Sequence, residues 1–198
     1  MRPGNICKGR RAGGTSAAFG ESEDIAVSDD LILVDLNDTQ IGTGEKLWVH
    51  QNDRLHRAFS VFLISGDGQR MLLQKRARGK YHSGGLWANA CCSHPRNGEV
   101  LEEAVERRLA EELGIAADVT ERFHFVYRAC FENGLTEYEY DHVFLGRFDG
   151  EVRPSEEEIE ETAWVGIEEL KKEVVENPKK FAAWFLIALP RVLEELEG

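Results

Sequence analysis

A thiol and an imidazole lie two residues apart in the middle of the chain, at Cys92 and His94. We expect the run that begins at Trp87 to form a strand, on which residues two apart share a face. Cys92 and His94 then point the same way, and Cys91 points the opposite way. Nearby cations would lower the pKa of the Cys92 thiol and make it a reactive nucleophile or acid/base group. The alternative is that Cys92, like most buried strand cysteines, is inert packing.

Three histidines and two glutamates could hold a metal ion. Glu137 and Glu139 lie two apart on an expected strand, and therefore on one face. With His50, His56 and His94 they would suit a divalent transition metal with an open coordination position. Taken singly, each histidine is more often a surface or satisfied core residue. The remaining histidines that nothing in the pattern singles out are interpreted in that way: His82, His124 and His142.

Basic residues form a further group of candidates: Lys46, Arg76, Lys80 and Arg108. Cations clustered beside a metal in a chain of net charge -12 would favour an anionic substrate such as a diphosphate. The alternatives are solvated charge and, for Arg108, an i,i+4 ion pair with Glu112. Glu111 and Glu112 lie in the last turn of an expected helix, where carboxylates oppose the helix dipole. A magnesium ion bound there would offset that unfavourable interaction.

The elements that position these residues are strands around one central helix. Pro95, Asn97 and Gly98 end the central strand in a turn, and residues 99–114 have a helical pattern that Gly114 terminates. Hairpins are expected at 55–76 and 121–148, with turns at 66–68 and 133–134, and further strands at 31–36 and 162–167. A C-terminal helix over 178–196 places Trp184 on an apolar face, where a core position is the simpler interpretation. Pro190 should kink or split that helix.

Composition and charge exclude several classes of protein. The chain has 198 residues, 42% of them hydrophobic, which fits one globular domain, expected over residues 29–198. Residues 1–28 lack periodicity and are expected to be a mobile tail. The net charge of -12 argues against nucleic-acid binding, and no apolar run is long enough to span a membrane. The four cysteines do not resemble a disulfide framework, which favours the cytoplasm. Strands that flank a central helix predict an α+β layered domain.

The central stretch resembles the Nudix box, G-x5-E-x7-R-E-U-x-E-E-x-G-U, where U is aliphatic. The matching positions are Ser93, Glu99, Arg107, Arg108, Leu109, Glu111, Glu112, Gly114 and Ile115. Ser93 replaces the first glycine of the pattern, and Arg108 replaces the glutamate that follows the arginine. The second change removes one of the acidic residues with which Nudix hydrolases gather metal ions, so it argues against pyrophosphate hydrolysis.

A second pattern is more specific. Asn-Ala-Cys-Cys-Ser-His-Pro at 89–95, Leu-His-Arg-Ala-Phe-Ser at 55–60, Tyr-Arg-Ala at 127–129 and the Glu-x-Glu at 137–139 resemble type I isopentenyl-diphosphate Delta-isomerase. The resemblance runs from about residue 31 to the C-terminus. It implies a Nudix-type α/β/α sandwich, a mixed sheet flanked by helices. The implied activity is isomerisation of isopentenyl diphosphate to dimethylallyl diphosphate, in isoprenoid biosynthesis.

The resemblance also implies roles for individual residues. It makes Cys92 and Glu139 the acid/base pair, with Tyr127 hydrogen-bonded to the glutamate. The implied ligands of a tightly bound Mn²⁺, Zn²⁺ or Mg²⁺ are His50, His56, His94, Glu137 and Glu139. Glu112 would bind a Mg²⁺ that also holds the substrate diphosphate, and Trp184 would face the developing carbocation. The implied diphosphate-binding residues are Lys46, Arg76, Lys80 and Arg108.

Two other functions stay open at this point. A Nudix diphosphohydrolase would release phosphate or pyrophosphate, which an isomerase would not. A degenerate Nudix domain that only binds a nucleotide would tolerate replacement of Cys92. The partner expected for the isomerase is a small isoprenoid diphosphate, with no nucleic acid and no membrane, and the chain is expected to be a monomer, with a homodimer as the alternative.

Overall fold

The computed structural model describes residues 30–80 and 82–197. Its helices are α1 (Lys46–Gln51), α2 (Leu101–Leu113), α3 (Ile167–Glu176) and α4 (Ala183–Glu197), with a 3-10 turn η1 at Pro178–Lys180. The strands are β1 (Leu31–Val34), β2 (Gln40–Gly44), β3 (His56–Ile64), β4 (Arg70–Arg76), β5 (Trp87–Asn89), β6 (Cys91–Ser93), β7 (Val119–Cys130), β8 (Thr136–Arg147) and β9 (Ile159–Gly166). No helix within the described ranges is long and apolar enough to cross a membrane. The expected tail, residues 1–28, lies outside the described residues.

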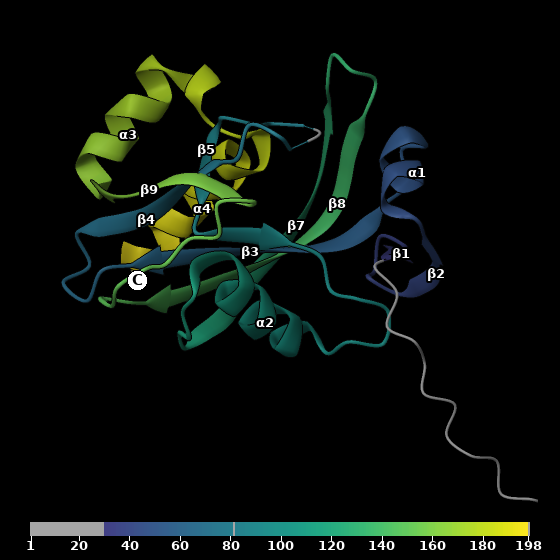
Figure 1. Ribbon diagram of the computed structural model, residues 1–198, viewed down its shortest axis with the longest axis horizontal. Coiled ribbons are helices and arrows are strands. Elements are labelled where there is room, and N and C mark those ends of the chain that lie inside the picture. The colour runs from purple at the N-terminus through teal and green to yellow at the C-terminus, as the bar shows by residue number, and fades with distance from the viewer. Residues whose placement is uncertain (1–29, 81, 198) are drawn as a thin grey trace, which may run out of the picture.

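Strand β3 is the centre of a mixed sheet. It pairs in parallel with β8 along its whole length, from His56 opposite Glu139 to Ile64 opposite Arg147. It also forms antiparallel pairs with β1, β4 and β6. Strands β7 and β8 form the long hairpin that rises above the sheet in Figure 1. Helices flank the sheet, which confirms the expected α+β architecture.

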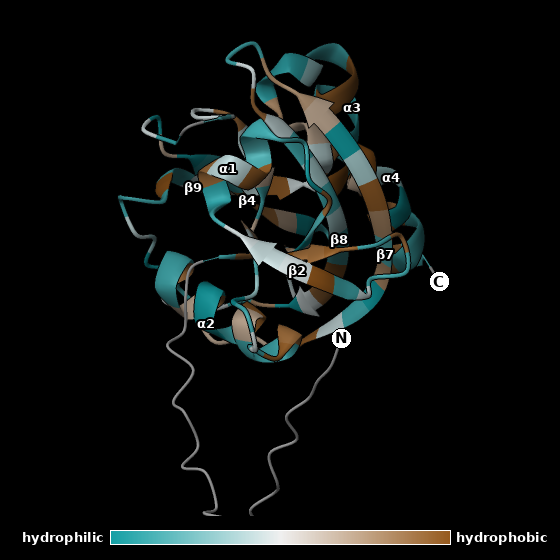
Figure 2. Ribbon diagram, turned by 90° about the vertical axis from the view of Figure 1, so that its right-hand side faces the viewer, coloured by the Kyte–Doolittle hydropathy of each residue, from teal (hydrophilic) through white to brown (hydrophobic). Residues whose placement is uncertain are grey.

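Two hydrophobic clusters occupy the two faces of the sheet, because side chains alternate along β3. Phe62 and Ile64 pack with residues of α4, whereas Val61 and Leu63 pack with residues of α2. Figures 1 and 2 show α2 and α4 on opposite sides of the strands, and Figure 2 shows that the residues of α2 are mostly hydrophilic. The mixed sheet thus separates an α2 face from an α4 face.

The expected central strand is two short strands instead of one. Strand β5 pairs with β4, and β6 pairs with β3. The side-chain amide of Asn89 donates to the backbone carbonyls of Val61 and Cys91 at 3.1 and 2.9 Å, so a side chain takes the place of the backbone ladder at the break. The alternation still holds in β6: Cys91 packs on the α2 face and Cys92 on the α4 face.

The C-terminal helix also differs from its prediction. It breaks at 181–182, where the backbone N–H of Ala182 donates to the Trp87 carbonyl at 2.9 Å. Helix α4 then continues through Pro190, so this proline does not split the helix, and a kink there stays a prediction. Helix α2 begins at Leu101 rather than at residue 99. It ends as expected at Gly114, whose φ of 65° is left-handed.

Candidate active site

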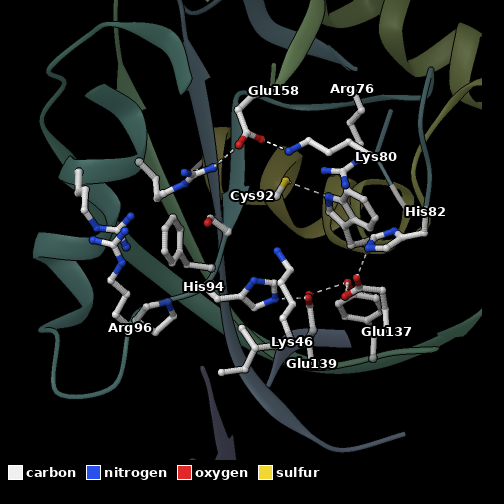
Figure 3. Close-up of a pocket in the computed structure, with 18 residues that line it drawn as sticks. Lys46, Arg76, Lys80, His82, Cys92, His94, Arg96, Glu137, Glu139 and Glu158 are labelled. Atoms are coloured by element: carbon white, nitrogen blue, oxygen red, sulfur yellow. Dashed lines mark hydrogen bonds and ion pairs between the residues drawn. The ribbon is translucent and has the colours of Figure 1, made fainter. Parts of the chain in front are cut away.

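A polar pocket is lined by residues from both faces of the sheet, including Arg108 of α2 and Trp184 of α4. Side chains from α1, β4, β6, β7, β8, α2 and α4 line it. Figure 3 shows cationic, carboxylate, imidazole and thiol groups converging there from these separate elements. The pocket is therefore assembled by the tertiary fold, since no single segment of the sequence supplies it.

Five of the predicted metal ligands meet at the floor of this pocket. The potential ligand atoms of His50, His56, His94, Glu137 and Glu139 all lie within 4.8 Å of one another. The register explains one of these contacts, because His56 of β3 lies directly beside Glu139 of β8. Except for His94, which is partly exposed, the five residues are buried.

The histidines are oriented as metal ligands. Nδ1 of His50 lies 2.6 Å from the Lys46 carbonyl, and Nδ1 of His56 lies 2.8 Å from the Arg54 carbonyl. Since a carbonyl only accepts, each Nδ1 carries the hydrogen and each Nε2 presents a lone pair. The Nε2 atoms nevertheless face carboxylate oxygens, at 3.2 Å for His50 to Glu137 and 3.5 Å for His56 to Glu139. Acceptors that face one another in a buried site fit a divalent cation between them.

The pKa shifts of two residues of the cluster, Glu139 and His94, agree with that fit. Burial raises the pKa of Glu139, but its hydrogen bonds with Glu137, His56 and Tyr127 outweigh burial and lower the pKa below its ordinary value. The Tyr127 hydroxyl donates to Glu139 at 2.6 Å. Burial, together with the nearby Lys46 ammonium, lowers the pKa of His94 well below its ordinary value. An ionised carboxylate and a neutral imidazole are the forms that bind metal ions.

Cys92 lies in the same pocket, and two side chains form hydrogen bonds with its sulfur. The indole Nε1 of Trp184 donates to the Cys92 sulfur at 2.9 Å, and the thiol donates to Oδ1 of Asn89 at 3.0 Å. The Ser60 hydroxyl lies 3.9 Å away and donates to the buried Asp141 at 2.8 Å. Cys91, in contrast, is fully buried on the opposite face of the sheet.

The expectation that cations would lower the pKa of Cys92 is wrong. Burial raises the pKa of the thiol, and the nearby Asp141 adds to the rise, while the Arg76 guanidinium only partly opposes it. Removing water from a thiolate disfavours the charged form more than one nearby cation favours it. Cys92 therefore stands as a protonated thiol at neutral pH.

The four predicted basic residues all line the pocket. The Arg76 guanidinium lies over the Trp184 indole, 5.1 Å from its centroid, and its buried Nε has no hydrogen-bond partner among the described residues. Lys80 forms an ion pair with Glu158, and Arg108 approaches the same glutamate at 3.3 Å. Burial lowers the pKa of Lys46, although Glu137 attracts its charge. The Nε–H of Arg76 is thus available to donate a hydrogen bond to a bound anion.

Glu112 lies apart from the five-residue cluster. It is buried at the end of α2, where Arg108 donates to its carboxylate at 2.5 Å, the expected i,i+4 pair. Burial raises the pKa of Glu112, and the guanidinium of Arg108 opposes that rise. Arg108, which lines the pocket, therefore lies between the pocket and Glu112. Two other residues of the Nudix box, Glu99 and Arg107, form a bidentate ion pair with distances of 2.6 and 2.8 Å.

The sequence analysis missed His82 and Glu158, which line the pocket, and the buried Asp141, which contacts Ser60. His82 was assigned to the unremarkable histidines, but it is buried and contacts Glu137 at 2.5 Å. Asp141 extends the alternation of Glu137 and Glu139 by one step, a signal that could have identified it. Glu158 ends a run of three glutamates, and nothing in that run distinguishes the one that reaches Lys80. Trp184, assigned to the core on pattern, belongs both to the core and to the pocket.

Comparisons with known proteins agree on one family. A model of the NUDIX domain matches residues 54–185. "Isopentenyl-diphosphate Delta-isomerase 1" of Aromatoleum aromaticum is 47% identical over 167 residues, covering 84% of this chain and 94% of the relative. The "Isopentenyl-diphosphate Delta-isomerase" of Serratia proteamaculans is 47% identical over 156 residues, covering 79% and 87%.

A comparison with solved structures finds proteins of similar fold. The crystal structure of DR0079 from Deinococcus radiodurans aligns with a TM-score of 0.67 at 19% identity and covers 82% of this chain and 98% of that protein. The MutT protein of Methanosarcina mazei aligns with a TM-score of 0.56 at 22% identity, covering 73% and 96%. At these identities the likeness concerns the fold alone.

Proposed function

The chain belongs to the isopentenyl-diphosphate Delta-isomerase family of Nudix proteins, and we propose that it exchanges isopentenyl and dimethylallyl diphosphate by proton transfers between Cys92, Glu139 and the substrate. The observation that carries the proposal is that the thiol of Cys92 and the carboxylate of Glu139 line one pocket together with the four predicted basic residues. Neither group would be needed at this place to bind a nucleotide.

The reaction requires two acid/base groups. One group adds a proton to the terminal CH2 of isopentenyl diphosphate, which leaves a tertiary carbocation, and the other removes a proton from C2. The double bond moves by one position, and no atom is gained or lost. Cys92 on β6 and Glu139 on β8 are on different strands, so a substrate between them can meet both groups. Tyr127 donates to the Glu139 carboxylate and holds it in place.

The cationic residues would bind the diphosphate. Arg76 offers its Nε donor, and Lys80 and Arg108 would exchange part of their contact with Glu158 for phosphate oxygens. Lys46 adds a fourth positive charge at the pocket wall. Binding at this end would place the hydrocarbon part of the substrate toward Cys92 and Trp184.

The carbocation needs an environment that stabilises it without reacting with it. The Trp184 indole supplies a π face, which attracts a cation electrostatically and offers no nucleophile. Helix α4 brings Trp184 to the pocket, and we propose that this helix covers the substrate and keeps away the water that would trap the cation. Trp184 also donates its N–H to the Cys92 sulfur, so one side chain would both position the catalytic thiol and stabilise the carbocation.

A metal ion fits the five-residue cluster, and His50, His56, His94, Glu137 and Glu139 would hold it. When bound, a divalent cation would supply positive charge that keeps Glu139 oriented and tunes its affinity for a proton. Mn²⁺, Zn²⁺ and Mg²⁺ all accept this mixed set of ligands. We propose that Glu112 serves a separate Mg²⁺ that arrives with the diphosphate.

A product assay tests the function. We expect the protein, incubated with isopentenyl diphosphate and Mg²⁺, to yield an acid-labile allylic diphosphate and no free phosphate. Release of phosphate or pyrophosphate would identify a diphosphohydrolase, a class that the replacement of a metal-gathering glutamate by Arg108 disfavours. Binding of the substrate without any product would identify a domain that only binds.

A further inference from the structure

His82 lines the pocket beside the five-residue cluster, and no motif of the sequence points to it. It lies in the loop between β4 and β5, and only 7% of its surface is exposed. Its Nε2 lies 2.5 Å from Oε1 of Glu137, the oxygen that His50 Nε2 approaches at 3.2 Å. Figure 3 shows the His82 side chain reaching the carboxylate of Glu137. Two imidazoles thus converge on one carboxylate oxygen.

The ring of His82 is fixed by its neighbours. It stacks on Phe131, which follows β7, with centroids 4.8 Å apart and an angle of 19°. It also meets the Trp184 ring edge to face at 6.1 Å. These contacts tie the β4–β5 loop to the β7–β8 hairpin and to α4. Because the same loop carries Lys80, a residue that fixes the loop also fixes one of the diphosphate-binding cations.

His82 lies outside the metal cluster itself. The five potential ligand atoms lie within 4.8 Å of one another, and His82 is not part of that group among the described residues. His82 contacts Glu137, one of the potential ligands, and does not itself supply a ligand atom to the cluster. Outer partners of this kind fix the orientation of a ligating carboxylate, and their loss typically weakens metal binding.

We propose that His82 is a positioning residue whose Nε2–H donates to Glu137 and holds this carboxylate in its metal-binding orientation. The inference rests on the proposed metal cluster. A carboxylate can rotate about its last bond, and a fixed donor on one side of Oε1 selects one rotation. The stacked ring of Phe131 and the edge of Trp184 keep that donor in place. Metal retention should therefore depend on the donor and not only on the volume of the side chain.

Two variants separate the donor from the ring. His82→Phe keeps an aromatic ring against Phe131 and Trp184 and removes the N–H. His82→Gln keeps an N–H donor at a similar distance along the side chain and removes the ring. His124→Phe is the matched control, because His124 is an exposed histidine on β7, between the residues Phe123 and Phe125 that pack on the α4 face.

Each purified protein is loaded with Mn²⁺ and titrated with a competing chelator, and bound metal is measured by elemental analysis. We expect His82→Phe to weaken retention by roughly 10- to 100-fold, the range for lost outer-shell partners. His82→Gln and His124→Phe should stay within about threefold of the wild type, since neither loses the donor to Glu137. Thermal unfolding of each metal-free variant checks that all three are folded.

The outcomes distinguish this inference from the function on which it rests. Wild-type retention by His82→Phe would overturn the positioning role while leaving the metal cluster intact. Equal losses in His82→Phe and His82→Gln would assign the effect to the shape of the imidazole and overturn the donor role. A wild-type protein that retains no Mn²⁺ at all would overturn the metal cluster and, with it, the role of His82.

Discussion

Cys92 accepts a hydrogen bond from the Trp184 indole and donates one to Asn89, while Cys91 packs among α2 side chains on the other face of the sheet. The adjacent thiols therefore have different surroundings although they share a strand of three residues. Burial raises the pKa of both thiols, so reactivity is not what distinguishes them. Their access to the pocket distinguishes them, and alternation along a strand determines that access.

Replacement of the two thiols should therefore have opposite effects. We expect Cys92→Ala to lower kcat by at least ~10³, within the range for losing a positioned acid/base group. Cys91→Ala should leave kcat nearly unchanged and lower the free energy of unfolding by about 1 kcal/mol, because it trims one small buried side chain. Steady-state kinetics and urea unfolding of both variants provide the measurement. An inactive Cys91→Ala beside an active Cys92→Ala would show that the catalytic assignment is wrong.

Among the elements, the hairpins and helices that are bounded by a turn or a cap in the sequence were predicted best. The hairpins of β3 with β4 and of β7 with β8 were expected within a few residues, because glycine-containing turns separate runs of apolar and branched residues. Helix α2 was expected from its pattern and its glycine stop. Helix α1 and strand β2 were not expected: α1 has six residues, and its apolar Leu47 and Trp48 are exposed, so no amphipathic pattern marks it.

The end of α2 gives a prediction about metal and substrate. Glu112 lies outside the five-residue cluster, so Glu112→Gln should leave the tightly held metal in place and raise KM for isopentenyl diphosphate. The predicted effect on KM follows from loss of a charge that would bind Mg²⁺ with the diphosphate. Elemental analysis and kinetics at several Mg²⁺ concentrations measure the two effects. Loss of the tightly held metal from the purified variant would show that Glu112 belongs to the five-residue site and that its assignment to a separate Mg²⁺ is wrong.

The start of α2 gives a prediction about pH. Glu99, which precedes the helix, accepts hydrogen bonds from the Arg107 guanidinium and from the backbone N–H of Arg96, and these lower its pKa below the ordinary value of 4.5. A pKa lower in the folded than in the unfolded state stabilises the protein above the unfolded value. That stabilisation disappears as the pH falls through the folded value.

Glu99→Gln should therefore destabilise the protein at pH 7 and matter less at acidic pH. We expect a loss of about 1.5 kcal/mol at pH 7, the low end for a hydrogen bond to a charged group. The difference from the wild type should shrink as the pH falls below 4.5. Urea unfolding at several pH values measures this, with Glu102→Gln, an exposed residue of the first turn, as the control. A difference that is the same at every pH would refute the electrostatic explanation.

For the whole molecule, the sequence motifs identified the residues of the pocket but not how they meet. The parallel pairing of β3 with β8 places His56 beside Glu139, and these residues are 83 positions apart in the sequence. Neither spacing nor composition predicts such a contact, so only the family resemblance implied that these candidate ligands meet at one site. Asp141, Glu158 and His82 were missed for the same reason, since their roles depend on neighbours from distant segments. That residues 29–198 form one domain stays a prediction.

The family's activity depends on a proton that passes from a protein group to carbon, and deuterium from the solvent reports that transfer most directly. We expect incubation of the protein with isopentenyl diphosphate and Mg²⁺ in D2O to give dimethylallyl diphosphate that carries solvent deuterium in the newly formed methyl group, observed by NMR. The added hydron comes from a side chain that exchanges with the solvent, and Cys92→Ala should suppress both product and label. Allylic product without deuterium, or phosphate released in place of it, would contradict proton transfer at this pocket.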